Sequence, residues 1–272
     1  MTRVGFVGAG RMGRPMVARL VAAGHDVRVL GRRPEQRAAL AELGATPVAD
    51  TADAARDAEV VVVCVFTDDQ VREVCLDGGL PAAMPAGATL VIHTTGSPRT
   101  VDAVAAQAAP CGVTVVDAPV SGGPHDIAAG RLTLFVGGDD DTVARLRPVL
   151  SAYADPLLAA GARGDGQRIK LVNNALFAAQ LGLVAEAVRL GGRLGVNEAA
   201  LLAALPHGSG ASRALGSIAA AGSVAAFTAA VAGFVGKDVA VLRKTVADLG
   251  GDLGILDAVI DAAASESTGD GH

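Results

Sequence analysis

The sequence predicts a doubly wound α/β domain followed by an all-helical domain, and three observations carry this prediction. Short apolar runs that are typical of buried parallel strands recur through the first part of the chain and then stop. A glycine-rich turn stands between the first of these runs and a helical segment. A proline-free stretch at residues 164–195 precedes a region of small apolar helices. We therefore expect an α/β domain over 1–163, a long interdomain helix over 164–194 and an all-helical domain over 195–272.

Composition and charge narrow the class of protein. The formal net charge of −5 provides no basic field for nucleic acid. No apolar run reaches the roughly 18 residues of a membrane span without a charge, and a strand begins too early to leave room for a signal peptide. The three cysteines form no CxxC pair, and the five histidines show no metal-ligand spacing. We expect a soluble cytoplasmic protein that binds no metal, nucleic acid or membrane.

The glycine turn follows the strand Arg3–Val7 and precedes the helical run Pro15–Ala23. The first glycine permits the tight turn, the second lets a pyrophosphate approach the backbone, and the third lets the helix pack on the strand. This order of strand, turn and helix indicates a Rossmann-like dinucleotide site. Its turn residues are Gly8, Ala9, Gly10, Arg11, Met12 and Gly13.

The end of the second strand, Val27–Leu30, indicates which dinucleotide is bound. An NAD site places an acidic residue here, but the chain has Arg32 and Arg33. Asp26 lies at the wrong end of the strand and Glu35 comes too late. Two guanidinium groups suit a 2′-phosphate, so the sequence favours NADP(H) over NAD(H). The alternative is that both arginines only solvate a loop.

Further strands are predicted at Val60–Phe66, Thr89–His93 and Val113–Val116, and also at Leu132–Val136 and Pro156–Ala160, with a helix at Asp140–Leu150. Ligands of open parallel sheets bind at the carboxyl ends of the strands. Thr94 and Thr95 stand at one such end. Ser121, Gly122 and Gly123 follow another, where a hydroxyl beside backbone N–H groups suits a carboxylate. A tight turn that binds no ligand explains the same residues equally well.

The stretch from Ile169 to Leu190 is apolar on every face, which predicts a helix that is buried all round. Spacings of three and four put Lys170 beside Asn173 and Asn174 on one side of it. The chain uses 20 arginines and only three lysines, so a lysine here suggests a cation that must be able to lose its proton. Burial in general lowers the pKa of an ammonium group towards the range useful for proton transfer. The alternative is a lysine that extends to the helix end.

Beyond Gly195 only helices are predicted. They cover Asn197–Leu205, roughly Ser212–Gly222, Ala225–Leu249 with a possible break, and Ile255–Ala264, with a frayed polar tail from Ser265. Such small apolar helices shield themselves poorly, so we expect this part to pack on a second copy, as a homodimer or higher homo-oligomer.

Several motifs in order make the chain resemble the β-hydroxyacid dehydrogenases related to 3-hydroxyisobutyrate dehydrogenase. They are GxGxMGxxM at Gly8–Met16, TTxSP at Thr94–Pro98, DAPVSGG at Asp117–Gly123, GRLTLFVGG at Gly130–Gly138, GxxGxGxxxKxxNN at Gly161–Asn174 and the pair Lys237-Asp238.

The resemblance implies a role for each matching residue. By this resemblance Lys170 is the catalytic acid/base, and Asn174 is the substrate ligand beside it. The substrate carboxylate would bind at Ser121, Gly122 and Gly123. Phe66, Thr95 and Lys237 come near the cofactor. The helical domain, like that of 6-phosphogluconate dehydrogenase, supports dimers. The implied activity is NADP(H)-dependent hydride transfer between nicotinamide and a small 3-hydroxy acid or semialdehyde-type carbonyl acid.

The chain also departs from the family. Ile92 stands where many relatives have an acidic residue, and Asp126 replaces a glycine after the SGG segment. Either His125 or Asp126 could contact the substrate. The alternative is that the loop simply accommodates larger side chains at these positions. Two alternatives to a hydroxy-acid enzyme remain: an imine reductase, which needs no carboxylate site, and a non-catalytic NADP(H)-binding sensor.

Overall fold

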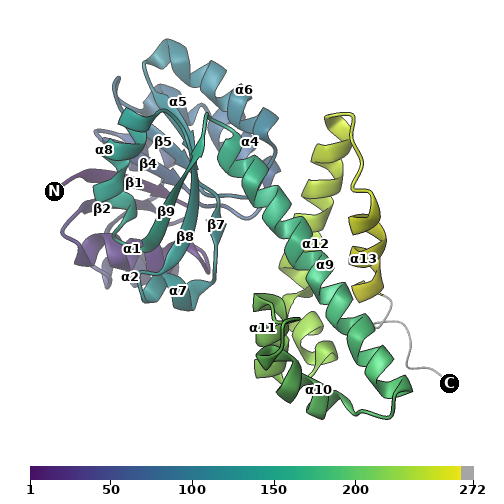
Figure 1. Cartoon of the computed structure of the whole chain (residues 1–272). Coiled ribbons are helices and arrows are strands. Elements are labelled where there is room, and N and C mark those ends of the chain that lie inside the picture. Colours follow the sequence, from purple (N-terminus) through teal and green to yellow (C-terminus); the bar gives the residue numbers. More distant parts are fainter. Residues whose placement is uncertain (265–272) are drawn as a thin grey trace. The chain divides into compact units, whose positions relative to one another are not determined.

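The computed structural model describes residues 1–264, so the predicted frayed tail lies outside the described residues. The chain forms two compact units, Met1–Lys170 and a second that starts at Leu171 (Figure 1). Their boundary lies inside one long helix. The three-part division drawn from the sequence stays a prediction.

The first unit is built on a nine-stranded sheet in the order β3-β2-β1-β4-β5-β6-β8-β7, with β9 paired to β8. The first six strands are parallel and follow the order of dinucleotide-binding sheets, whereas β8 runs antiparallel to β6. The strands are β1 Arg3–Val7, β2 Asp26–Leu30, β3 Thr46–Val48, β4 Val60–Val63, β5 Thr89–Ile92, β6 Thr114–Asp117, β7 Val120–Ser121, β8 Leu132–Gly137 and β9 Ala154–Gly161.

Helices cover both faces of this sheet (Figure 1). Alternate residues of β4 enter two separate apolar cores: Val60 and Val62 pack with α1 and α8, and Val61 and Val63 pack with α3 and α6. A strand that is apolar at every position therefore lies in the middle of the sheet, as predicted. The helical segments of this unit are α1 Gly13–Ala22, α2 Pro34–Ala41, α3 Thr51–Ala55, α4 Asp68–Arg72, η1 Glu73–Asp77, α5 Leu80–Ala83, α6 Pro98–Ala108, η2 Ala109–Cys111, α7 Pro124–Ala128 and α8 Asp140–Leu150.

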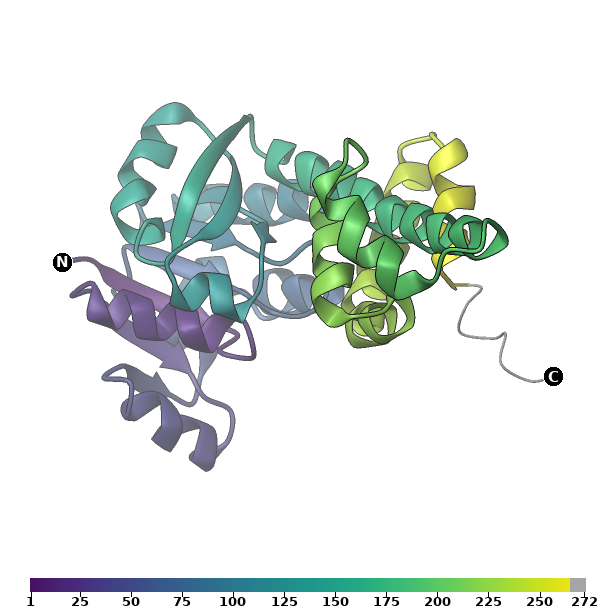
Figure 2. The ribbon, with the colours of Figure 1, turned by 60° about the horizontal axis from the view of Figure 1, so that its bottom comes forward.

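The second unit contains only helices among its described residues. Helix α9, Asp165–Arg193, begins in the first unit and supplies apolar side chains to two small cores, one shared with α10 to α12 and one with α12 and α13. Figure 2 gives a second view of these helices. The other helical segments are α10 Glu198–Ala204, η3 Leu205–His207, α11 Arg213–Ala221, α12 Val224–Asp248 and α13 Ile255–Ala264. The possible break in α12 does not occur.

The prediction that α9 is buried all round is wrong. One face of the helix leaves large apolar side chains exposed, with exposed fractions of 69% for Val172, 53% for Leu176, 56% for Leu183 and 50% for Leu190. Apolar residues on every face of a helix indicate that each face packs against other apolar residues. They do not show whether those residues belong to the same chain or to another. We call this row of four residues the α9 stripe.

Two helices, α9 and α12, are long and apolar enough to cross a membrane by length and composition alone. Half of the qualifying window of α9 is buried in the structure, against 17% of that of α12. Core helices of soluble proteins satisfy the same criterion, so it is weak evidence for a span. The predicted absence of a membrane partner stays a prediction.

Candidate active site

The glycine turn has the geometry that the sequence pattern predicts. Gly8 adopts a φ of +104°, and a Cβ on it would overlap the carbonyl oxygen of Cys64. A Cβ on Gly13 would overlap the carbonyl oxygen of Gly8, so only glycine lets α1 start this close to β1. A Cβ on Gly10 would point into open space. The backbone at Gly10 is therefore open to a ligand.

An open groove of about 500 Å³ lies beside this turn. Three guanidinium-bearing residues line it, namely Arg11, Arg14 and Arg33. Arg32 is not among the lining residues, and its backbone N–H donates to the Gln36 side chain at 3.1 Å. Sequence reasoning missed Arg14, which has no motif of its own and is recognised only by its position on the first turn of α1. The guanidinium groups of this groove suit a dinucleotide phosphate by charge.

Glu35 also lines this groove. Glu35 comes too late after β2 for this role by its position in the sequence, but the turn into α2 places it in the same groove as Arg33. A carboxylate here is the group that holds a ribose diol in NAD sites. The groove therefore contains groups suited to either dinucleotide, with the arginines in excess.

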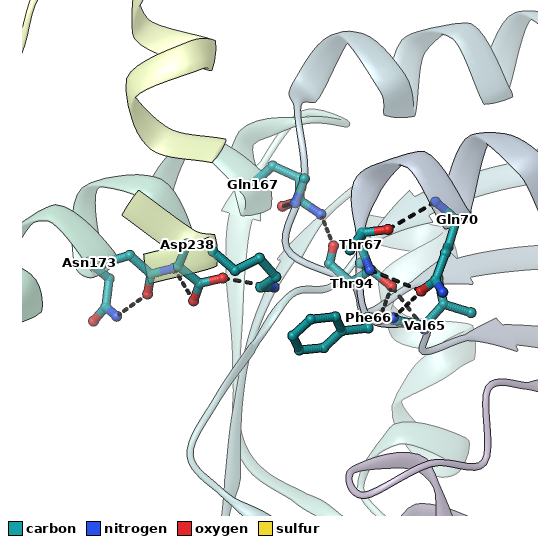
Figure 3. A network of polar contacts seen from close by, with 11 residues as sticks. Val65, Phe66, Thr67, Gln70, Thr94, Gln167, Asn173 and Asp238 are labelled. Carbon is teal, nitrogen blue, oxygen red and sulfur yellow. Dashed lines mark hydrogen bonds and ion pairs between the residues drawn. The ribbon is translucent and has the colours of Figure 1, made fainter. Parts of the chain in front are cut away.

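The carboxyl ends of β4 and β5 are held together by local hydrogen bonds (Figure 3). The Thr94 hydroxyl donates to the Val65 carbonyl at 2.9 Å and accepts from the Val65 N–H at 3.0 Å. The Phe66 N–H donates to Gln70 at 2.9 Å, and the ring of Phe66 is 60% exposed. Thr95 is buried. Thr94 therefore ties two strands together, and Phe66 presents an exposed ring at the edge where cofactors bind.

Asp117, at the end of β6, anchors the start of α9. Its carboxylate accepts from the N–H of Gly164 at 2.6 Å and from the N–H of Gln167 at 2.7 Å. It is completely buried, and this desolvation raises its pKa, while the two backbone hydrogen bonds lower the pKa in part. A Cβ on Gly166 would come 2.8 Å from the same carboxylate, so glycine lets the first turn close around it. The helix thus begins at a buried carboxyl group that accepts hydrogen bonds from two backbone N–H groups.

Gln167 joins this helix start to the loop after β5 (Figure 3). Its side-chain N–H donates to the Thr94 carbonyl at 2.8 Å, and its side-chain oxygen accepts from the Gly96 N–H at 3.0 Å. The residue has an exposed fraction of 0%. Lys170 follows one turn later on α9 and is only 8% exposed. The buried lysine therefore stands on a helix turn that two buried polar residues hold in place.

Asp238, on α12, belongs to the Lys237-Asp238 pair, and the sequence pattern indicates no role for it. Its carboxylate accepts from the Asn174 side-chain N–H at 2.9 Å and forms an ion pair with Lys237 at 2.8 Å (Figure 3). Asn174 is 6% exposed, and Asn173 donates to its oxygen at 3.4 Å. The structure thus brings together Asn174 and Lys237, which sequence reasoning assigned to the substrate and to the cofactor. A spacing of 64 residues gave no local signal for the contact.

The Ser121–Gly123 loop contains a contact that the sequence left open. Ser121 pairs with Thr133 of β8, which holds the loop at the sheet edge. The Gly123 N–H, assigned to the substrate carboxylate, donates to the Asp126 carboxylate at 2.8 Å. His125 is exposed. Asp126 therefore contacts the backbone of the loop itself.

His93 and Tyr153 form a buried pair below the same sheet edge. Ring nitrogen Nδ1 of His93 lies 2.6 Å from the Ala118 carbonyl, which can only accept, so Nδ1 carries the proton. Nitrogen Nε2 then accepts from the Tyr153 hydroxyl at 2.8 Å. Burial lowers the pKa of His93 to about 4. This histidine is a neutral structural group. The described residues contain no cluster of three His, Cys, Asp or Glu that could hold a metal ion.

Comparison with known proteins agrees with this geometry. Residues 3–161 match the family described as the NAD binding domain of 6-phosphogluconate dehydrogenase, and residues 164–271 match the one described as NAD-binding of NADP-dependent 3-hydroxyisobutyrate dehydrogenase. The chain belongs to the β-hydroxyacid dehydrogenase family. Members of this family are NAD(P)-dependent oxidoreductases that act on CH–OH groups, which confirms the predicted fold class and enzyme class.

Three relatives illustrate the match. The 3-hydroxyisobutyrate dehydrogenase of Pseudomonas aeruginosa is 38% identical over 216 residues, which cover 79% of this chain and 72% of the relative. The 3-sulfolactaldehyde reductase of Escherichia coli is 35% identical over 191 residues, covering 70% of this chain and 64% of the relative. The structure of Mycobacterium tuberculosis 3-hydroxyisobutyrate dehydrogenase with L-serine superimposes with a TM-score of 0.87 at 31% identity, covering 99% of this chain and 94% of that one.

Proposed function

We propose that this β-hydroxyacid dehydrogenase uses NADP(H) to interconvert a small 3-hydroxy acid and its semialdehyde-type carbonyl acid. The observation that carries the proposal is a single lysine, Lys170, 8% exposed, on the helix turn that Asp117 and Gln167 anchor. Buried lysines are rare unless they are paired or their chemistry is needed. Asn174 follows one turn later on the same helix and is also buried.

The proposed roles follow from the chemistry of each group. The nicotinamide, when bound, supplies or accepts the hydride. Lys170 accepts the proton of the substrate hydroxyl during oxidation and returns it to the carbonyl oxygen during reduction. Asn174 holds that oxygen, and Asp238 orients the amide of Asn174 through their hydrogen bond. The Ser121 hydroxyl and the Gly122 N–H hold the carboxylate of the substrate.

The experiment that tests the proton-transfer role replaces Lys170. Lys170→Ala should lower turnover of NADPH with malonic or tartronic semialdehyde by about 10² to 10⁴, the usual size of a general acid/base contribution, while NADPH binding measured by thermal shift stays intact. Lys170→Arg should fail almost as badly, because a guanidinium does not release its proton. Lys244→Ala is the matched control, since Lys244 is exposed and paired with Asp248.

The outcomes separate the rival functions. Near-normal turnover in Lys170→Arg would falsify the proton-transfer role. Reduction of a cyclic imine in preference to both semialdehydes would favour an imine reductase. Tight NADPH binding without turnover of any of these compounds would favour a sensor.

We also propose that Arg33 and its neighbours make the enzyme prefer NADP(H). The three arginines that line one groove, Arg11, Arg14 and Arg33, offer bidentate partners for a 2′-phosphate. Of the two arginines named from the sequence, Arg33 lines this groove and Arg32 does not. Arg33→Ala should raise the KM for NADPH about tenfold and leave that for NADH unchanged, as expected for one charge-assisted contact. Arg147→Ala, on exposed surface of α8, is the control. An equal change for both cofactors would contradict the preference.

The expected partners and location remain proposals. We propose a cytoplasmic homodimer or higher homo-oligomer, without nucleic-acid or membrane partners, in which a second copy covers the α9 stripe. Support comes from the four exposed apolar side chains on one helix face. Leu176→Glu combined with Leu183→Glu should lower the mass measured by sedimentation, since it would bury two charges in the contact. An unchanged mass would place the contact elsewhere.

A further inference from the structure

The carboxylate of Asp126 lies against the loop that would hold the substrate. Its Oδ2 accepts from the Gly123 N–H at 2.8 Å. A Cβ built on Gly122 would come 2.9 Å from the same oxygen, so the carboxylate also touches the neighbouring residue. Asp126 is half-buried there and does not extend freely into solvent. The chain thus holds a negative charge at the point where it offers donors to an anion.

This contact changes what the loop can bind. The loop has three donors, namely the hydroxyl of Ser121 and the N–H groups of Gly122 and Gly123. One of the three already has a charged acceptor. A substrate carboxylate that takes the other two comes close to a like charge, which disfavours it. The loop therefore binds an acid with no hydrogen-bond donor beside its carboxylate less tightly than the Ser121-Gly122-Gly123 pattern alone indicates.

A hydrogen-bond donor on the substrate removes this penalty. A hydroxyl or ammonium group beside the substrate carboxylate can donate to Asp126, whose oxygens accept more than one hydrogen bond. A methyl group or hydrogen in that position leaves the like charges unopposed. Size alone does not separate these groups, because methyl, hydroxyl and ammonium are nearly isosteric. The discrimination is one of hydrogen bonding and charge.

We propose that Asp126 is a specificity-determining residue that makes this enzyme select 3-hydroxy acids carrying a hydrogen-bond donor on carbon 2. The proposal rests on the proposed function and narrows its substrate class. Asp126 takes no part in proton transfer, and it acts only on which acid binds productively.

A series of four acids that differ only at carbon 2 tests the proposal: 3-hydroxypropionate, 3-hydroxyisobutyrate, glycerate and serine, which carry hydrogen, methyl, hydroxyl and ammonium. The wild-type kcat/KM with NADP⁺ should be at least about tenfold higher for glycerate or serine than for the first two. Thermal shift with NADP⁺ and each acid should give the same order, which tests selection even without turnover.

Two variants assign the selection to Asp126. Asp126→Asn keeps an acceptor for the Gly123 N–H but removes the charge, so serine should lose more than glycerate. Asp126→Gly frees the N–H, so 3-hydroxypropionate should gain about tenfold while glycerate and serine fall. Asp139→Asn is the control, because Asp139 accepts from Thr142 N–H at 2.9 Å at the start of α8, away from this loop. It should leave all four ratios unchanged.

The failures are distinguishable. Turnover or binding of all four acids with ratios that Asp126→Asn and Asp126→Gly do not change overturns the selection and leaves the proposed function standing. A wild-type preference for hydrogen or methyl overturns it as well. Absence of turnover with all four acids and both semialdehydes overturns the proposed function. In that case the order of the four acids in the thermal-shift measurement still tests whether Asp126 selects among them.

Discussion

The two units of this protein differ in how completely they bury their apolar side chains. In the first unit the strands β4 and β5 are buried at every position by helices of the same unit. The second unit is much shorter, yet it contributes ten of the fourteen large apolar side chains that are exposed among the described residues. The first unit covers most of its apolar side chains itself, whereas the second has more apolar surface than its own helices cover.

This difference is consistent with the roles proposed for the two units. A cofactor domain must hold a turn, a groove and several strand ends in fixed positions, and a closed core provides that rigidity. A helical unit with open apolar faces can associate with a further copy, as proposed above. In its polar cluster Asn174 is buried, whereas the side chains of Lys237 and Asp238 are 20% and 15% exposed.

The largest expected effect comes from one matched pair of substitutions. Phe6→Ala, at a residue with an exposed fraction of 0%, should lower the free energy of unfolding by about 3–5 kcal/mol, because it leaves a cavity between β1 and α1. Phe234→Ala, at a residue that is 43% exposed, should change it by less than about 0.5 kcal/mol. Urea unfolding measures both. Equal losses would show that the second unit is as closely packed as the first.

A smaller effect is expected where the units share helix α9. Asp117→Ala should cost about 3 kcal/mol of unfolding free energy, because two buried N–H groups, of Gly164 and Gln167, lose a charged acceptor. Asp117→Asn keeps one acceptor oxygen and should cost less. Thermal unfolding gives the loss, and equal stability of Asp117→Ala and wild type would show that the helix start does not depend on this carboxylate.

The smallest effect concerns pH and belongs to the first unit alone. The pKa of His93 is about 4 in the folded state, below its ordinary value of 6.5, because burial disfavours the charged ring. The unfolded chain therefore takes up a proton below pH 6.5 while the folded chain does not, so stability is lost as pH falls from 6.5 towards 4. The loss should reach about 2 kcal/mol at pH 5.

The control for this prediction is His93→Asn, which removes the titrating ring. The difference in unfolding free energy between wild type and variant should shrink as the pH falls, as measured by urea unfolding at pH 7.5 and pH 5. A difference that stays constant between these two values would show that His93 is not the group responsible.

Local patterns were sufficient for much of the first unit. The glycine turn, the apolar runs of β4 and β5 and the helix at Asp140–Leu150 were predicted closely, because each depends on residues adjacent in sequence. The short strands β3 and β7 were missed, since two or three residues carry no periodicity. The burial of Lys170 and Asn174 agrees with the prediction from their spacing. Their roles in catalysis stay proposals.

The sequence by itself determined the fold class, the dinucleotide turn and the unusual lysine. Each of these depends on the residue types at a few neighbouring positions of the chain. The tertiary structure alone decided that Asp117 anchors α9, that Asp238 holds Asn174 and that the α9 stripe lies open. The first two contacts join residues 47 and 64 positions apart, which no local pattern can signal. Composition shows that a face is apolar, but only packing shows whether the same chain covers it.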